Sequence, residues 1–485
     1  MASKIWLLWL VVALQEAELD KPPAPDQRRS VLFWLIDTCR ADHLSVYGHG
    51  RRTTPFLERL AAEGVAFESC YSQAPWTKPA MASILTSQYP SVHGSTQLFS
   101  MLNSDFVTFP ELLRAAGWYT AGFSANPIMG RFSNYNQGFH RFAEAPYMIE
   151  GASPMDYASG SAAKIVPHAV KWLESNERHP FFLYMHSLDP HEWYNPAPEF
   201  KEKFADPAFE EQYRKDWDKL MKLHEQIVNT CTQETFDQAG VEVGPFIDYG
   251  MKLYDADILA NDDAIEKLFE HLGEEGHGER MIVVVTADHG VEFFEHGATS
   301  LGHSLYNEMI HVPLIFWAPD LLPAGLRFSE PVRSVDIFPT LLDLLGLEIP
   351  PGLMGQSLLP WIRDGKATEA REVYSENIEE LLSIMNEQTR KYTNGMSVSL
   401  IRMPWKLILN LKPRLSLPQP RHELYHIESD PKETTNVADQ HPEIVKELEQ
   451  AILARFKDRA QEPAARPEQV DPEILEALRA LGYIR

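Results

Sequence analysis

Short runs of apolar, β-prone residues alternate with helical patterns over residues 31–360. The clearest runs are Val31–Ile36 (VLFWLI), Phe181–His186 (FFLYMH), Met281–Ala287 (MIVVVTA) and Val312–Trp317 (VPLIFW). Such uninterrupted apolar runs are typical of parallel strands that are covered on both faces. Helical patterns lie between them, at Thr54–Glu63, Phe109–Ala116, Ala162–Ser175, Asp248–Leu272 and Val335–Leu345. This alternation predicts an α/β domain whose doubly wound, mostly parallel sheet is flanked by helices.

The pattern changes after about residue 360. Short β-prone pieces follow at Glu372–Ser375, Ser397–Arg402, Trp405–Leu409 and His422–Ile427, and a helical pattern covers Pro442–Lys457. Several short strands followed by one helix predict a small α+β domain with an antiparallel sheet. We therefore expect the α/β domain at residues 31–360 and the α+β domain at 361–460. A proline-rich, charged tail at 461–485 should end in a short helix.

The N-terminus carries an apolar run, Ile5–Leu14, directly after Lys4. This run is too short to span a bilayer and matches the apolar centre of a signal peptide. We predict a signal peptide at residues 1–17 and a polar linker at 18–30. The protein would then be exported to the periplasm or the cell exterior, with no stable membrane span. The alternative is a cytoplasmic protein or one that keeps the apolar run as an N-terminal anchor.

The chain is acidic, with a formal net charge of −25 over 485 residues. Such a chain repels nucleic acid, so a nucleic-acid partner is not expected. A small anionic substrate would need a local positive patch, and a metal ion is a simple way to make one. The three cysteines form no metal-binding spacing and are interpreted as packing residues. Composition does not determine the oligomeric state.

Acidic and imidazole side chains follow three of the predicted strands. Asp37 follows the first, the stretch His186–His191 ends the second, and the pair Asp288-His289 follows the third. Ligands of open α/β sheets bind beyond the carboxyl ends of the strands, so these side chains could converge. Together they indicate a metal site with oxygen and nitrogen ligands. A single aspartate after a strand would more often be a helix N-cap.

Thr77 stands at the start of a predicted helix, after the turn Pro75-Trp76. A hydroxyl at this position can be an N-cap worth about 1 kcal/mol. It can also be a nucleophile whose pKa is lowered by a metal ion and by the helix dipole. The residue spacing does not choose between these two roles.

The segment Thr77–Gly94 (TKPAMASILTSQYPSVHG) resembles the signature of the sulfatase family, within the alkaline phosphatase superfamily. Other segments resemble that family in the same order along the chain. They are LIDTCRADHLSVYG from Leu35, MHSLDPH from Met185, YDADILANDDAIEKL from Tyr254, TADHGVEFFEHG from Thr286, SVDIFPTLLDLLGL from Ser334 and ELYHIESDPKETTNVA from Glu423. The resemblance covers nearly all of Val31–Arg485 and implies a metal-dependent ester hydrolase with an alkaline phosphatase-like fold.

The family pattern implies roles for individual residues of this chain. The implied metal ligands are Asp37, Thr77, Asp288 and His289. The implied catalytic residues are the nucleophile Thr77, His191 and, near the leaving group, His303. The implied substrate-binding residues are Asn126, Lys78 and His191. The expected cofactor is one divalent ion, zinc or manganese before calcium or magnesium, and a second ion could also bind.

Two departures from the family pattern affect the expected reaction. Sulfatases use a cysteine or serine that is oxidised to formylglycine, but threonine cannot form an aldehyde because its β-carbon carries a methyl group. The family's Cys-x-Pro-Ser-Arg core reads Thr77–Met81 (TKPAM) here, and its paired aspartates read Asp37-Thr38. A threonine nucleophile resembles relatives that act on phosphorus, and the chain as a whole resembles phosphonate monoester hydrolases and phosphodiesterases.

These features predict hydrolysis of a phosphodiester, phosphomonoester or phosphonate monoester through a phosphorylated Thr77. The metal-bound hydroxyl would attack phosphorus in line, while His191 and Asn126 stabilise the charge. The alternatives are a sulfuric ester hydrolase that works without formylglycine and an inactive relative that only binds. A transferase is less favoured, because such relatives usually carry a membrane domain. The segment Glu292–Gly297 is expected to support the metal ligands, with His296 in a structural role rather than as a ligand.

Overall fold

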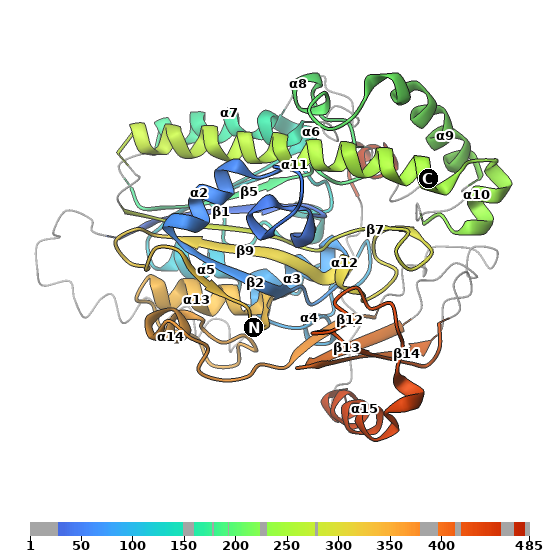
Figure 1. Cartoon of the computed structure of the whole chain (residues 1–485). Helices are drawn as coiled ribbons and strands as arrows, with labels where there is room; N and C mark the ends of the chain where they lie inside the picture. Colours follow the sequence, from blue (N-terminus) through green and yellow to red (C-terminus); the bar gives the residue numbers. More distant parts are fainter. Residues whose placement is uncertain are drawn as a thin grey trace, which may run out of the picture.

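The computed structural model describes residues 28–148, 160–176, 179–192, 194–223, 230–276, 280–378, 396–412, 419–456 and 470–480. The expected signal peptide and most of the expected linker lie outside these residues. None of the described helices combines the length and the apolar composition that crossing a membrane requires. A large mixed sheet and a small antiparallel sheet carry most of the fold (Figure 1).

The larger sheet is the centre of the α/β domain. Its order is β10-β2-β9-β6-β1-β5-β3-β4, and β11 also pairs with β2. The strands are β1 (Ser30–Ile36), β2 (Val65–Tyr71), β3 (Tyr119–Ser124), β4 (Arg141–Glu144), β5 (Phe181–Ser187), β6 (Met281–Ala287), β9 (His311–Trp317), β10 (Leu326–Phe328) and β11 (Val332–Arg333). β1 is central, parallel to both β5 and β6, and buried along its whole length. Burial on both faces explains the apolar sequence of β1. Its parallel pairing with both neighbours confirms the predicted mostly parallel sheet.

One strand differs from the prediction of parallel strands. The apolar run that ends at Trp317 forms β9, which is antiparallel to both β2 and β6. The chain between β6 and β9 forms the hairpin β7 (Glu292–Phe293) and β8 (Thr299–Ser300) and the short helix α12 (Asn307–Ile310). No long helical crossover carries the chain back to the opposite end of the sheet. β9 therefore begins at the end where β6 finishes and runs in the opposite direction. An apolar run indicates burial on both faces but not strand direction.

Helices cover both faces of the larger sheet (Figure 1). One face carries α2 (Pro55–Glu63), α7 (Ser161–Glu174) and α11 (Val243–Glu274), and the other carries α3 (Thr77–Thr86), α5 (Phe109–Ala115), α13 (Ile337–Leu344) and α14 (Leu359–Asp364). The five helical patterns in the sequence correspond to helices here. α11 begins before its expected start at Asp248, because Pro245 falls in the first turn, where a helix tolerates the missing N–H.

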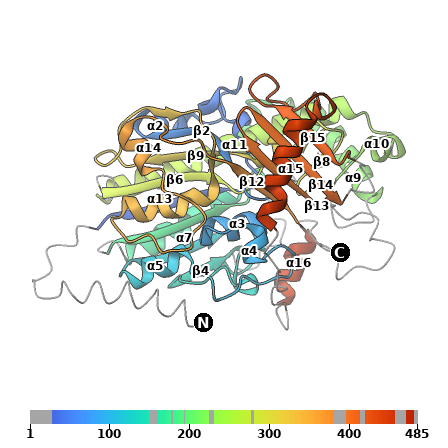
Figure 2. The same cartoon turned by 90° about the horizontal axis from the view of Figure 1, so that it is seen from below.

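The smaller sheet and one helix form the C-terminal α+β unit (Figure 2). Its strands are β12 (Val373–Asn377), β13 (Met396–Arg402), β14 (Trp405–Lys412) and β15 (His422–His426), each antiparallel to the next, and its helix is α15 (Pro442–Phe456). Side chains alternate between the two faces of the strands. Leu400 and Leu407 pack against α15, whereas Ile401 and Ile408 pack toward α12. The sheet therefore has two apolar faces, and one of them attaches it to the α/β domain.

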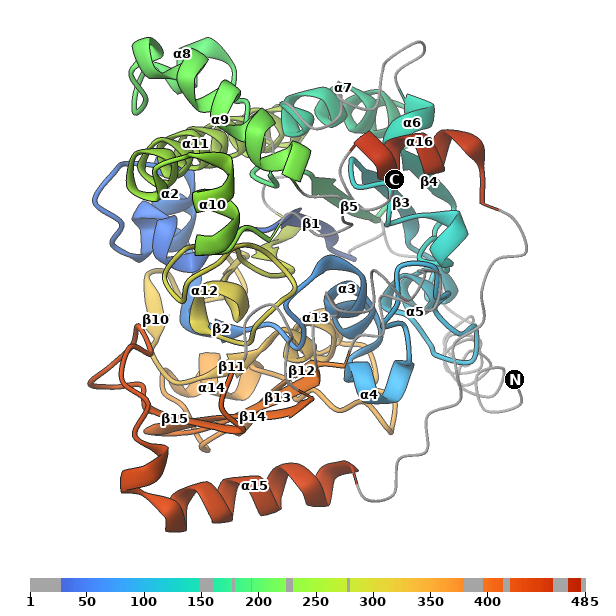
Figure 3. The same cartoon turned by 90° about the vertical axis from the view of Figure 1, so that its right-hand side faces the viewer.

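The last described helix, α16 (Pro472–Ala480), lies beside α6 (Ala145–Met148) (Figure 3). Ile474 and Leu478 are four residues apart, so they share one helix face. Both pack into a buried cluster that includes Phe132. The C-terminal segment thus returns to the α/β domain after leaving the smaller sheet.

Candidate active site

The register of the central sheet brings two aspartates to one edge. Ile36 of β1 pairs with Ser187 of β5 on one side and with Ala287 of β6 on the other. Asp37 and Asp288 are the next residues, so they leave the sheet side by side at the carboxyl ends of their strands. Both side chains are completely buried.

A turn in an unusual conformation holds these two aspartates. Thr38 has a φ of 58°, in the left-handed region that β-branched residues rarely adopt. Its N–H donates to Asp288 Oδ1 (3.0 Å) and its hydroxyl donates to Asp37 Oδ1 (2.6 Å). Its carbonyl accepts a hydrogen bond from the Tyr254 hydroxyl (2.8 Å). These hydrogen bonds offset a conformational cost of about 1–3 kcal/mol. Thr38 stands where the family pattern has a second aspartate. Through its hydrogen bonds it links Asp37 to Asp288.

Asp37, Asp288 and His289 form a group that can hold a cation. Their ligand atoms lie within 4.8 Å of one another, and all three side chains are buried. Among the described residues, none gives Asp288 Oδ2 a hydrogen bond. His289 Nε2 lies 3.4 Å from this oxygen, and a buried carboxylate oxygen without a hydrogen bond is costly unless a cation binds it. Together with the Thr77 hydroxyl, this donor set fits a divalent ion such as zinc or manganese.

The two carboxylates differ electrostatically. Burial alone would raise the pKa of Asp37, but the hydrogen bond to His186 Nε2 (3.0 Å) and the charges of nearby histidines lower it below its usual range. Burial and the charge of Asp37 raise the pKa of Asp288. The Asn126 amide donates to Asp37 Oδ2 (2.5 Å) and so orients that carboxylate. The expected binding of the substrate anion by Asn126 stays a prediction.

Thr77 begins α3 beside this group. Its hydroxyl lies 3.2 Å from His289 Nε2, and the residue is 1% exposed. The N-cap position of α3 belongs to Trp76, so the hydroxyl of Thr77 is not the cap of this helix. Thr77 instead lies at the positive end of the helix dipole and next to the grouped ligands. This placement is the one that a metal-activated nucleophile requires.

Of the two basic residues expected at the anion, His191 lies near the metal group and Lys78 contacts other residues. His191 is buried, and its charge acts on Asp37. The amine of Lys78 donates to the carbonyl of Leu98 and lies 4.8 Å from the centre of the Phe132 ring. Burial lowers the pKa of Lys78 well below its ordinary value. Substrate binding by Lys78 therefore stays a prediction that its observed contacts do not support.

His303 precedes α12 and is buried. Its Nε2 lies 2.6 Å from Glu292 Oε2, and the other carboxylate oxygen of Glu292 accepts from the N–H groups of His296 and Ala298. Burial alone would raise the pKa of Glu292, but the charge and hydrogen bond of His303 lower it below its ordinary value. Glu292 therefore fixes the imidazole that the family pattern places near the leaving group.

The sequence interpretation grouped His186 with the predicted metal site only through its place at a strand end, and it gave Tyr254 no role. His186, at the end of β5, joins Asp37 to the Tyr184 hydroxyl, which lies 2.9 Å from its Nδ1. Its position at a strand end was the available signal. Tyr254 lies on α11, far along the chain from the Thr38 carbonyl that it binds. Only the tertiary contact reveals that Tyr254 supports the turn at Thr38.

A second group of potential ligands consists of His43, His49 and Asp255. Its carboxylate is already paired, because His43 Nδ1 lies 2.7 Å from one oxygen and Arg51 donates to the other (2.5 Å). A guanidinium on the carboxylate opposes the binding of a further cation. The cluster attaches the loop before α2 to α11, so we assign it a structural role. It does not support the second metal ion considered from the sequence.

His296 contacts protein acceptors through both ring nitrogens. Its Nδ1 lies 2.5 Å from Glu308 Oε1, and its Nε2 lies 3.0 Å from the carbonyl oxygen of Glu433. The ring stacks on Tyr306 with 3.6 Å between centroids. These contacts support the expected structural role and link the loop after β6 to the segment that follows β15.

Stability is expected to fall as rising pH removes the proton from His296. Burial alone would lower its pKa, but Glu308 raises it to about 9 from an ordinary 6.5. The folded state binds this proton more tightly than the unfolded state, so the stabilisation is complete below pH 6.5 and is lost by about pH 9. Urea denaturation should show that the deficit of His296→Phe, which keeps the stack on Tyr306, shrinks by about 1–2 kcal/mol over this range. An unchanged deficit would mean that the proton contributes nothing.

The family of the protein follows from comparison with known proteins. The sulfatase family profile matches residues 29–347, and the profile described as N-sulphoglucosamine sulphohydrolase, C-terminal, matches residues 295–458. The fold and the site define a hydrolase of the alkaline phosphatase superfamily. The chain belongs to the sulfatase family and is an enzyme that hydrolyses esters.

Individual relatives indicate the chemistry. The chain is 27% identical to an N-acetylglucosamine-6-O-sulfatase of Bacteroides thetaiotaomicron, over 75% of this chain and 76% of that protein. It is 26% identical to arylsulfatase K of Homo sapiens, over 92% and 87%. A phosphonate monoester hydrolase of Agrobacterium radiobacter has the same fold, with a TM-score of 0.69, 19% identity, and coverage of 89% and 96%. The sequence relatives favour the sulfuric ester alternative over the phosphate esters that we expected from Thr77.

Proposed function

We propose that this protein hydrolyses a sulfate ester with unmodified Thr77 as its nucleophile. The observation that carries the proposal is the position of the Thr77 hydroxyl, beside His289 and the two aspartates at the carboxyl edge of the sheet. The names of the sequence relatives support sulfate as the transferred group. Because threonine cannot become formylglycine, the reaction would pass through a sulfated threonine.

The charge of the site supports a substrate with one negative charge on the ester group. The basic side chains that act on Asp37 and Asp288 include His186, His191 and His289. These are imidazoles, and the amine of Lys78 is bound elsewhere. Two carboxylates, one divalent cation and several imidazoles stabilise a second negative charge poorly. A sulfate monoester or a phosphodiester therefore suits the site better than the dianion of a phosphate monoester.

A divalent cation held by Asp37, Thr77, Asp288 and His289 would lower the pKa of the Thr77 hydroxyl and withdraw charge from the ester. Thr77 would release its hydroxyl proton to solvent, and its alkoxide oxygen Oγ1 then forms a bond to sulfur while the bond from sulfur to the leaving oxygen breaks. His303, positioned by Glu292, donates a proton to that oxygen. His191 donates a hydrogen bond to a non-bridging oxygen. In the second step His303 takes a proton from water, whose oxygen attacks sulfur and releases Thr77 and inorganic sulfate.

Hydrolysis of a phosphodiester or phosphonate monoester is the second candidate function. Thr77 itself favours it, because direct attack by an alkoxide is well suited to phosphorus and needs no aldehyde. The same residues would act in the same steps, with a phosphorylated Thr77 in place of a sulfated one. The two functions differ in the transferred group and share the site.

A comparison of three esters with one leaving group tests the proposal. With metal-loaded enzyme, we expect kcat/KM to be highest for 4-nitrophenyl sulfate, lower for bis(4-nitrophenyl) phosphate and about tenfold lower again for 4-nitrophenyl phosphate, a difference of roughly 1.4 kcal/mol. A mock purification from host cells that do not express the protein measures activity from contaminants. A diester rate above the sulfate rate would establish the second candidate instead. A preference for the phosphate monoester would refute the charge argument.

A further inference from the structure

The smaller sheet meets the α/β domain along the chain that leads into α3. Its edge strand β12 makes this contact (Figure 3). The N–H of Glu376 donates to the carbonyl of Gln73 (2.8 Å), and the hydroxyl of Ser375 donates to the carbonyl of Ser72 (2.6 Å). Asn377 ends the strand. The C-terminal unit therefore delivers this side chain toward the active site.

The amide of Asn377 is attached to the loop that carries His303. Its Nδ2 donates to the carbonyl of Gly302 (3.1 Å), and the N–H of Gly302 donates to the carbonyl of Pro75 (3.0 Å). Gly302 directly precedes His303, and Pro75 lies two residues before Thr77. Through one glycine, Asn377 is thus connected to the segments of the proposed nucleophile and of the proposed proton donor to the leaving oxygen.

The carboxamide oxygen of Asn377 is buried and has no hydrogen bond. The residue is 1% exposed, and no group of the residues that the structure describes donates to its Oδ1. Because Gly302 offers a carbonyl oxygen, the amide nitrogen must face it, and the amide cannot turn round to use Oδ1 there. A buried acceptor without a donor is costly. A donor on a bound substrate would remove this cost.

The sheet face around Asn377 is polar and uncharged. Val373 packs toward α12 on the apolar part of this face. Side chains alternate along a strand, so Ser375 and Asn377 lie on the same face as Val373. Their partners on β13 are Ser399 and Ser397, and all four polar residues are buried. The face therefore changes from apolar to polar toward the end of β12, where Asn377 stands.

A second unpartnered group lies in the His303 loop. Ser304 directly follows His303 and is 3% exposed, and within the described part of the chain its hydroxyl has no hydrogen bond. Neutral groups of this kind stabilise a buried charge poorly. They match a hydroxyl group, which can donate to the oxygen of Asn377 and still accept a hydrogen bond itself.

We propose that Asn377 determines specificity by accepting a hydrogen bond from a hydroxyl group on the alcohol portion of the substrate, near the esterified oxygen. Its place at the alcohol portion rests on the proposed function, in which His303 protonates the leaving oxygen. The substrate is then an ester of an alcohol that carries at least one further hydroxyl. A substrate without that hydroxyl leaves Oδ1 buried and unpaired, so the enzyme discriminates against it.

Esters that differ by one hydroxyl test the proposal. 2-Hydroxycyclohexyl sulfate, as its cis and trans isomers, carries a hydroxyl beside the ester, and cyclohexyl sulfate lacks it. With metal-loaded enzyme, we expect kcat/KM to be at least about tenfold higher for one hydroxylated isomer. Asn377→Leu, which keeps the branched shape without polar atoms, should reduce this preference to within about twofold. The preference is a ratio measured within each variant, so a general loss of activity from the broken contact with Gly302 cancels.

Two further variants separate binding from structure. Asn377→Asp keeps an acceptor and should keep the preference, although its charge repels the anionic ester and lowers all rates. Asn410→Leu changes another buried asparagine of the smaller sheet, whose amide donates to the carbonyl of Pro420 (2.7 Å), and should leave the preference unchanged. If Asn377→Leu does not fold, Asn377→Ala replaces it with the same expectation. No preference in the wild type, a preference that survives loss of the Asn377 amide, or an equal loss in Asn410→Leu would overturn the proposal.

The ester group is varied so that this proposal and the proposed function can fail separately. The same alcohols are prepared as methyl phosphodiesters, and 4-nitrophenyl sulfate, which has no hydroxyl, reports on the proposed function alone. A preference that depends on Asn377 in the diesters only would leave the role of Asn377 standing and refute sulfate ester hydrolysis. Turnover of 4-nitrophenyl sulfate without any hydroxyl preference would do the reverse. No turnover of either ester class would refute both.

Discussion

Removal of the Thr77 hydroxyl is expected to lower kcat by about 10,000-fold or more, the size of effect usual for loss of a nucleophile. Thr77→Val is the suitable change, because valine keeps the branched shape of this buried residue and lacks only the oxygen. The measurement is single-turnover and steady-state hydrolysis of the ester that the wild-type enzyme prefers. Rapid acid quench followed by mass spectrometry of the Thr77 peptide should detect the sulfated or phosphorylated residue in the wild-type enzyme alone.

Thr77→Ser is the matched control for this prediction. Serine keeps a hydroxyl at the start of α3, so we expect hydrolysis to remain within about tenfold to 100-fold of wild type. Thr77→Val should fold normally and keep most of its affinity for metal, since Asp37, Asp288 and His289 remain. If Thr77→Val loses less than about tenfold in kcat, water or another side chain is the nucleophile.

Removal of the divalent metal is expected to abolish hydrolysis and to lower the free energy of unfolding. Metal present at 1,000 times its dissociation constant stabilises the folded state by about 4 kcal/mol. Thermal unfolding with and without a chelator measures this loss, and elemental analysis gives the identity and number of bound ions. Re-addition of zinc, manganese, calcium or magnesium singly should restore activity with the native ion. Full activity after complete metal removal would show that the three grouped residues serve another purpose.

Asp288→Asn should separate metal binding from folding. Burial and the charge of Asp37 raise the pKa of Asp288, so this carboxylate is unfavourable in the metal-free protein. We therefore expect the variant to bind less than about a tenth of the metal and to lose activity, yet to be at least as stable as metal-free wild type. Asp255→Asn, in the second cluster, is the control: it should keep the metal but destabilise the fold by leaving Arg51 without its partner. Lower stability of metal-free Asp288→Asn would contradict this electrostatic account.

Much of the site could be predicted because strand ends are visible in the sequence. The runs that end at Ile36 and Ala287 are buried on both faces, so their ends can be located from composition alone. Parallel neighbours finish at one edge of the sheet, which is why Asp37 and Asp288 could be grouped before their register was known. The family resemblance added the position of Thr77. The substrate class was predicted less well. The prediction of a phosphate ester rested on the chemistry of Thr77, whereas the sequence relatives favour a sulfate ester.

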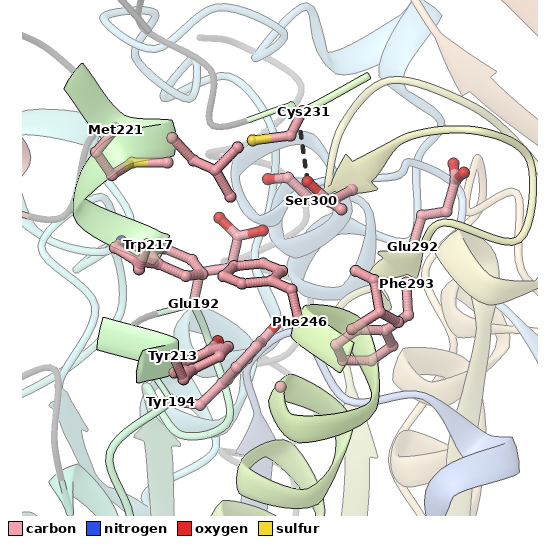
Figure 4. Close-up of a pocket in the computed structure, with 14 residues that line it drawn as sticks. Glu192, Tyr194, Tyr213, Trp217, Met221, Cys231, Phe246, Glu292, Phe293 and Ser300 are labelled. Atoms are coloured by element: carbon pink, nitrogen blue, oxygen red, sulfur yellow. Dashed lines mark hydrogen bonds between the residues drawn. The ribbon is translucent and has the colours of Figure 1, made fainter. Parts of the chain in front are cut away.

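Contacts between distant segments were not predictable by the same means. The direction of β9 depends on the end of the sheet at which the chain re-enters after β6. An apolar run carries no such information. Substrate binding by Lys78, which the family pattern implies, stays a prediction, and the contact of its long side chain with the Leu98 carbonyl could not be anticipated from the sequence. The aromatic rings drawn in Figure 4 come from segments separated along the chain, and only packing brings them together.

The sequence by itself determined the α/β architecture, and it placed Asp37, Asp288 and His289 at strand ends and Thr77 at the start of a helix. Burial pattern and strand ends are local properties, and each of these residues stands directly at the end of an element. Only the tertiary structure decided what surrounds them: the hydrogen bonds that hold Thr38 in its left-handed conformation, the link from Glu292 to His303, and the carboxylate of Glu192 among aromatic rings. The physical reason is that hydrogen bonds and electrostatic attraction depend on the distance between two groups in space. The separation of those groups along the chain does not reveal this distance.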